Sequence, residues 1–198
     1  MDMEGNVIGD ESHYNEAGFT IHSWVYRDRP DVQCVLHTHA RAGIAISITK
    51  KGLLPISQDA ALLMNDLAYH VYGTPSTQAE CEELGRSCQK ANNIILRNHG
   101  LLTVGQSIPS TFSRMWRLEH ACSTQVAAMS MNDELVQISP EVLAEVEDKY
   151  WDFDWLYKAQ VWVIWFSKWY WEVAWLDQAL SLIHISEPTR RYAISNAV

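Results

Sequence analysis

Two apolar runs that each end in histidine constrain this sequence more than any other feature. The run Val35 to Ala40 ends in His37 and His39, and the run Ile94 to Gly100 ends in His99. Short apolar runs rich in β-branched residues predict buried strands. Side chains at positions i and i+2 of a strand lie on the same face, so His37 and His39 can present both imidazoles to one point.

Histidines placed in this way suit a metal ion. Imidazole is a common neutral ligand of zinc and similar ions, and three protein ligands with one open position are typical of catalytic sites. The third histidine, His99, is distant in sequence from His39, so only the fold can bring it to the pair. An isolated His-x-His is more often structural. The second run, ending in Asn98-His99-Gly100, favours a metal site.

Several ordered motifs resemble the class II aldolase/adducin family, and its adducin-like branch above all. These motifs are Gly18 to His22, Arg29 to Val32, His37 to His39, Leu53 to Ser57, Ala68 to His70 and Arg97 to Leu101. The resemblance extends from about Gly5 to about Asp148. It implies an α/β fold, an α/β/α sandwich around a largely antiparallel sheet. It also implies a homo-oligomer, usually a tetramer with active sites at subunit interfaces.

The resemblance implies a function as well. In the family, the histidines matching His37, His39 and His99 bind zinc or another divalent ion. Manganese, iron and cobalt are alternatives, because imidazoles discriminate weakly among these ions. The implied activity is that of a lyase or isomerase, which acts on a small sugar-like hydroxy-carbonyl compound through a metal-stabilised enediolate. The alternative is a catalytically silent, adducin-like association module.

The general base is the weakest part of the resemblance. In the aldolase branch a glutamate serves as acid and base, and its place falls at Gly18, which cannot titrate. Two replacements are candidates: Glu16, two residues earlier, and Asp59, where other branches place a catalytic acid. Each also fits a solvated loop residue. His22 and His70 are interpreted as core residues that could line the pocket.

The sequence divides into three parts. Residues 1–148 are interpreted as a partial head domain, incomplete at the N-terminus because the family's Gly-Asn-x-Ser type anion loop is missing. Residues 149–180 hold seven of the nine tryptophans. Charged residues interrupt this segment too often for a membrane span, which leaves an interfacial helix or a chimeric segment as alternatives. Residues 181–198 resemble a translated sequencing adapter and are excluded from fold reasoning.

Charge and cysteine usage narrow the range of expected partners and cellular compartments. A net charge of −9 and a pI near 5.3 argue against nucleic acid or an anionic membrane as partner. The acidic start, Met1 to Gly5, lacks the pattern of a secretory signal. The four cysteines show no Cys-x-x-Cys spacing, which favours reduced thiols. We therefore expect a cytoplasmic protein whose partners are a small-molecule substrate and other copies of itself.

Residue patterns also predict the secondary structure. Helices are expected over residues 18–29, 42–49, 59–67, 77–90 and 107–131. Strands are expected at residues 35–40, 53–56, 68–72, 93–96 and 100–105. Asp59 is available as the cap of the third helix.

Overall fold

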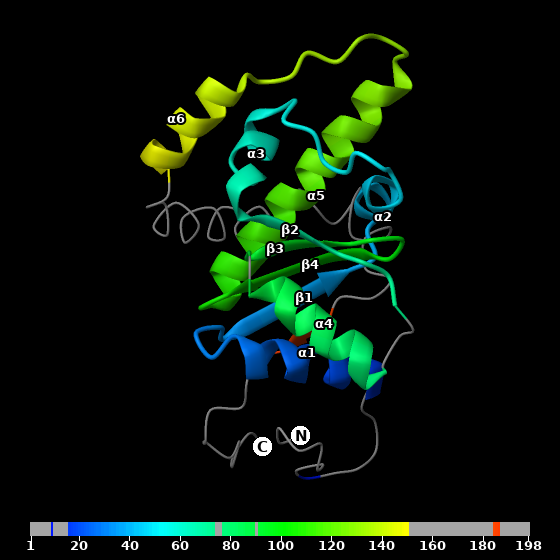
Figure 1. Ribbon diagram of the computed structural model, residues 1–198, viewed down its shortest axis with the longest axis vertical. Helices are drawn as coiled ribbons and strands as arrows, with labels where there is room; N and C mark the ends of the chain where they lie inside the picture. The colour runs from blue at the N-terminus through cyan, green and yellow to red at the C-terminus, as the bar shows by residue number, and fades with distance from the viewer. Residues whose placement is uncertain (1–8, 10–15, 74–76, 90, 151–183, 187–198) are drawn as a thin grey trace, which may run out of the picture.

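A mixed β-sheet with helices on both faces forms the centre of the molecule (Figure 1). The computed structural model describes residues 9, 16–73, 77–89, 91–150 and 184–186. The elements are, in chain order, α1 (Glu16–Asp28), β1 (Cys34–Thr38), α2 (Arg41–Ser47), α3 (Gln58–Ala61), the 3-10 helix η1 (Met64–Asp66), β2 (Leu67–His70), α4 (Gln78–Cys88), β3 (Asn93–Leu96), β4 (Gly100–Gly105), α5 (Ile108–Ser130), α6 (Pro140–Tyr150) and β5 (His184–Ser186).

The sheet has the strand order β2-β3-β4-β1-β5. Strands β2 and β3 are parallel, and every other neighbouring pair is antiparallel. Strand β4 lies between β3 and β1, so that Leu96 pairs with Gly100 and Thr38 pairs with Leu101. This register brings the end of β1 next to the turn that joins β3 to β4. The predicted largely antiparallel α/β sheet is confirmed.

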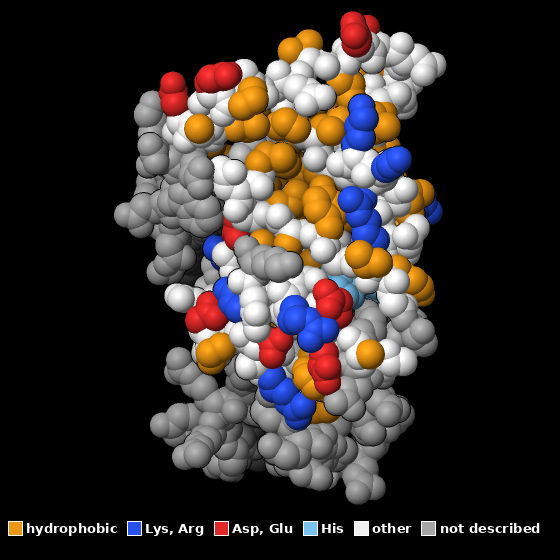
Figure 2. All heavy atoms as spheres, viewed as in Figure 1, with side chains coloured by type: hydrophobic (Ala, Val, Ile, Leu, Met, Phe, Trp, Pro, Cys, Tyr) orange, Lys and Arg blue, Asp and Glu red, His pale blue; other side chains and the backbone are white. Residues whose placement is uncertain are grey.

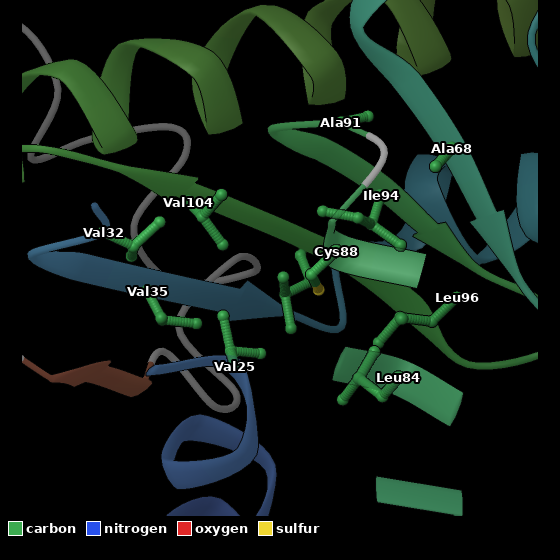
Figure 3. Close-up of a cluster of buried hydrophobic side chains, with 11 residues drawn as sticks. Val25, Val32, Val35, Ala68, Leu84, Cys88, Ala91, Ile94, Leu96 and Val104 are labelled. Carbon is green, nitrogen blue, oxygen red and sulfur yellow. The ribbon is translucent and has the colours of Figure 1, made fainter. Parts of the chain in front are cut away.

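The helices form a layer on each face of the sheet. Figure 1 shows α1 and α4 on one side, and α2, α3 and α5 on the other. Each layer buries its own apolar cluster: Val25, Leu84 and Ile94 belong to the α1/α4 side, shown in Figure 3, and Ile95 and Leu118 to the α5 side. Consecutive residues of β3 thus pack into the apolar clusters on opposite faces of the sheet, as expected of a strand covered on both faces.

Side-chain caps explain where several helices begin. The Ser57 hydroxyl accepts the Ala60 N–H at the start of α3, and the Ser107 hydroxyl accepts the Ser110 N–H at the start of α5. Ser57, rather than the predicted Asp59, is therefore the cap of α3. Helix α2 differs, because its cap residue Ala40 offers no side-chain acceptor.

Two predicted elements around residue 60 are wrong in detail. Residues 53–56 form no strand, because the N–H groups of Leu53 and Leu54 bind side chains rather than a neighbouring strand. The Leu53 N–H donates to the Tyr69 hydroxyl at 2.9 Å, and the Leu54 N–H to Gln125 Oε1 at 2.7 Å. The helix expected over residues 59–67 is divided into α3, η1 and the first residue of β2.

The four cysteines, Cys34, Cys81, Cys88 and Cys122, are all buried and form no disulfide. This agrees with the prediction of reduced thiols. Cys88 also takes part in a backbone contact that closes the α1/α4 layer, since its carbonyl accepts Arg29 Nη1 at 2.7 Å. The same guanidinium pairs with Asp31.

The two tail segments fall largely outside the described residues. Of residues 149–198, the structure describes the end of α6 and the short strand β5, which pairs antiparallel with β1. The division into residues 1–148, 149–180 and 181–198 therefore stays a prediction. Within the described residues, no helix combines the length and apolar character that crossing a membrane requires.

Candidate metal centre

Three histidines from separate parts of the chain meet at one end of the sheet. His37 lies near the end of β1, His39 follows it by two residues, and His99 lies in the β3–β4 turn. The Nε2 atoms of His37 and His39 are 2.8 Å apart, and those of His39 and His99 are 2.9 Å apart. The predicted trio is therefore brought together, with ligand atoms within 4.8 Å of one another.

The β3–β4 turn has the backbone needed to deliver His99. Asn98 adopts a left-handed conformation with φ of 59°, which asparagine tolerates better than most residues. The His99 N–H then donates to the Leu96 carbonyl at 3.1 Å. A Cβ on Gly100 would lie 2.4 Å from the Thr38 carbonyl oxygen. Only glycine therefore allows β4 to begin this close to the end of β1.

A hydrogen bond sets the tautomer of His37, and burial sets its charge. Its Nδ1 lies 2.8 Å from the Leu101 carbonyl, which can only accept, so Nδ1 carries the proton and Nε2 presents a lone pair to the cluster. Burial lowers the pKa of His37 to about 3; the bond to Leu101 opposes this shift, and nearby His99, His39 and His22 add to it. Neutral imidazole is the form that binds metal.

The donor set fits a divalent cation. His39 Nε2 faces both other Nε2 atoms, and a single proton there can serve only one of the two contacts. Three convergent nitrogens with too few protons between them suit a positive ion. His37 is buried whereas His39 and His99 are partly exposed, so the cluster is open on one side.

Tyr72 borders this open side, and its position was not predicted. Its ring meets the His99 ring edge to face, with centroids 6.2 Å apart, and the residue is 52% exposed. The strand expected over residues 68–72 ends at His70, so Tyr72 lies two residues beyond β2, and no periodic pattern marks it as a site residue.

The two predicted bases lie elsewhere or beyond description. Asp59 on α3 is bound to α5: its Oδ1 accepts Arg117 Nη1 at 3.0 Å, and its Oδ2 lies 2.6 Å from His120 Nδ1. Glu16 is the first residue of α1, and its side chain is not among the described groups. Within the described part of the chain, no carboxylate joins the three histidines.

His22 and His70 are core residues, as interpreted from the sequence. They are 5% and 3% exposed. His70 Nδ1 lies 3.2 Å from the Ser87 hydroxyl on α4, on the face of the sheet that α1 and α4 cover. Of the two, His22 alone is close enough to His37 to affect its pKa.

Glu119 on α5 is a second residue that the sequence did not reveal. Its Oε2 accepts the Gly43 N–H at 3.1 Å, and the Ala42 N–H also donates to its carboxylate. Burial raises the pKa of Glu119 to about 7, and the two backbone hydrogen bonds oppose the shift. A partner 76 residues away leaves no local signal.

Comparison with known proteins gives this geometry a family context. The model of the class II aldolase and adducin N-terminal domain matches residues 1–126. A Pseudomonas aeruginosa protein whose name assigns it to aldolase class 2 is 45% identical over 150 residues, which are 75% of this chain and 58% of that protein. Mouse alpha-adducin is 39% identical over 148 residues, covering 71% of this chain and 20% of adducin.

Solved structures give the same match. The aldolase II superfamily protein from Pseudomonas syringae is 39% identical with a TM-score of 0.74, over 82% of this chain and 67% of that one. The L-fuculose 1-phosphate aldolase from Glaciozyma antarctica is 34% identical with a TM-score of 0.63, over 73% and 56%. The chain spans a little over half the length of the bacterial curated relatives that it matches.

Proposed function

The chain belongs to the class II aldolase and adducin family, and from this premise we propose that His37, His39 and His99 bind a divalent metal ion. The observation that carries the proposal is the convergence of three Nε2 atoms, with His37 kept neutral by burial and its ring turned by the Leu101 carbonyl. Zinc is the first choice for three imidazoles, with manganese, iron and cobalt as alternatives.

We propose further that the protein is a lyase or isomerase acting on a small sugar-like hydroxy-carbonyl compound. Its similarity to an L-fuculose 1-phosphate aldolase supports this reaction class. A bound ion would supply a Lewis acid that polarises the carbonyl oxygen of the substrate. The three histidines would hold that centre, and Tyr72, at its exposed side, would border the bound compound.

The proton would be moved by Glu16 or by Asp59. Glu16 lies in the first turn of α1, two residues before Gly18. Asp59 is held by Arg117 and His120, so it would act only after leaving one of these partners, or in the site of a neighbouring copy. A base must approach its proton to hydrogen-bond distance, which makes a substrate complex the decisive test of either residue.

A catalytically silent association module is the second candidate. It is favoured by Gly18 at the place of the aldolase glutamate and by the 39% identity to mouse alpha-adducin. Either function fits a cytoplasmic homo-oligomer, a tetramer by family likeness. Exposed apolar side chains support association; Figure 2 shows them gathered over the upper part of one face. Among the described residues from the middle of α5 onward, the large apolar side chains that are exposed are Val126, Met129, Met131, Val136 and Val142.

Elemental analysis of the purified 198-residue chain tests the metal proposal. We expect about one divalent ion per chain, lost in His99→Ala. His120→Ala is the matched control, because His120 is exposed, contacts Asp59 and lies outside the cluster. A folded wild-type protein without bound metal would contradict the enzyme proposal and leave the association module. Light scattering of the same sample then gives the number of copies in the assembly.

A further inference from the structure

We propose that Glu119 is a positioning residue for the metal centre: from α5, its carboxylate holds the start of α2 and, through it, the segment that carries His37 and His39. This inference rests on the proposed function, in which these histidines are ligands. Glu119 would act through the backbone and would not contact the metal or the substrate.

The first argument is that α2 needs an acceptor from outside. A helix leaves its first backbone N–H groups without partners within the helix, and a polar cap residue normally accepts one of them. The cap residue of α2 is Ala40, which cannot do so. Glu119 accepts the N–H groups of both Ala42 and Gly43 instead. Because α2 begins two residues after His39, this contact fixes the chain just beyond a proposed ligand.

The second argument is the close approach at Gly43. A Cβ there would lie 2.5 Å from the Leu101 side chain and 3.0 Å from Glu119 Oε2. The missing side chain therefore lets α2, β4 and α5 meet at one point. Leu101 is also the residue whose carbonyl orients the His37 ring. Gly43, which Glu119 contacts, thus lies beside two segments of the proposed site. One is the start of α2, just after His39, and the other is Leu101, which orients His37.

The third argument comes from the preceding turn of α5. Met115 lies four residues before Glu119, hence on the same face of the helix. The Thr38 hydroxyl donates to Met115 Sδ at 3.4 Å. One face of α5 therefore contacts Thr38, between the first two histidines, and the backbone just after the second. Two contacts that bracket His39 restrict where its imidazole can lie.

Three variants of the 198-residue chain test the proposal. Glu119→Ala removes the acceptor, whereas Glu119→Gln keeps an acceptor oxygen of nearly the same reach. Gln125→Ala is the matched control, because Gln125 also extends from α5 to loop backbone: it accepts the Leu54 N–H at 2.7 Å and donates to the Gly52 carbonyl at 2.9 Å. Both alanine variants lose hydrogen bonds from α5 to backbone, but only Glu119→Ala loses them beside His39.

Cobalt(II) titration is the first measurement, followed by the visible spectrum of the bound ion. We expect Glu119→Ala to bind cobalt about tenfold more weakly, as is usual when a supporting group is removed. Its spectrum should also change, because the histidine geometry shifts. Glu119→Gln and Gln125→Ala should stay close to the wild type. Equal affinity and an unchanged spectrum in Glu119→Ala, or an equal loss in Gln125→Ala, would overturn the proposal.

Hydrogen exchange of the metal-free proteins is the second measurement, and it does not depend on metal binding. Glu119→Ala should lose protection at Ala42 and Gly43, and Gln125→Ala at residues 52–54 instead. If the wild type binds no cobalt, the proposed metal function fails, and exchange alone then decides whether Glu119 holds this segment. Unchanged protection at Ala42 and Gly43 in Glu119→Ala would overturn the inference.

Discussion

At His37, a single hydrogen bond decides which ring nitrogen is available. The Leu101 carbonyl takes the Nδ1 proton, which leaves Nε2 as a lone pair facing His39 and His99. The orienting group belongs to the backbone of β4, so no side-chain substitution can remove it. The tautomer of His37 is therefore determined by the pairing of β1 with β4.

Glu119 makes the stability of the fold depend on pH. Its pKa is raised from 4.5 to about 7, so the folded state favours the neutral carboxyl. The wild type should therefore lose stability relative to Glu119→Gln as the pH rises from about 4.5 through 7, by at most about 3 kcal/mol, and then level off. Urea unfolding of both metal-free proteins at pH 5 and pH 8 measures this difference. An equal difference at the two pH values would contradict the raised pKa.

Asp59 offers a test of the proposed base. Asp59→Asn can still accept Arg117 Nη1, so we expect the fold and the metal content to be preserved. If Asp59 moves the proton, the rate of retro-aldol cleavage or epimerisation should fall by roughly 10²- to 10⁴-fold. Rates are compared with those of Glu16→Gln under saturating metal. The variant whose rate matches the wild type is eliminated as the base.

At the residue scale, the sequence predicted the site residues that lie at the ends of apolar runs. It did not reveal those whose partners are far away in the chain. His37, His39 and His99 lie at or just beyond the ends of apolar strands, and their types suggest ligands even before the sheet is known. Glu119 looks like any other carboxylate on a helix. Its significance comes from Gly43, and that contact exists only once α5 is packed on α2.

At the scale of elements, β4 carries a glycine at each end with different consequences. A Cβ at Gly100 meets the Thr38 backbone oxygen at 2.4 Å, whereas one at Gly105 meets the Thr111 hydroxyl at 2.6 Å and the Ser110 hydroxyl at 2.9 Å. Backbone cannot move aside as a side chain can. Gly100→Ala should therefore cost about 1–3 kcal/mol and weaken metal binding, and Gly105→Ala should cost less. Urea unfolding and metal titration of both variants check this, and equal losses would contradict it.

Strands and helices were predictable where local pattern and packing agree. Residues 93–96 and 100–105 are largely apolar and form β3 and β4 with the expected bounds. Residues 53–56 are similarly apolar, yet the N–H groups of Leu53 and Leu54 bind Tyr69 and Gln125 instead of a strand. An apolar run shows that a segment is buried, but it does not show which partner will satisfy the backbone.

At the scale of the molecule, an ion would connect segments far apart in the chain. The histidines lie at the end of β1 and in the β3–β4 turn, which approach one another only in the folded state. Free metal at 100 times its Kd should add about 2.7 kcal/mol of stability. For a chain of this size we expect the Tm to rise by roughly 5–10 °C. Differential scanning fluorimetry with and without chelator measures the rise, and His99→Ala should show none.

The layered architecture could be anticipated only through resemblance. Periodicity predicts that strands and helices alternate, but the order β2-β3-β4-β1-β5 and the parallel pairing of β2 with β3 depend on long-range pairing. The family model matches residues 1–126, and the chain covers 58% of one curated relative. A family pattern supplies such topology because it records pairings that no short window of sequence contains.

The buried cysteines allow the rate at which the folded protein opens to be measured. Burial raises the pKa of the Cys88 thiol to about 12 and that of Cys122 also well above its usual range, and thiolate is the form that reacts. Cys81 is equally inaccessible, and Cys34 is nearly so. A thiol-reactive disulfide dye should therefore label only molecules that have opened. The colour it releases would time the opening of both helical layers, in a chain that needs no added reporter group.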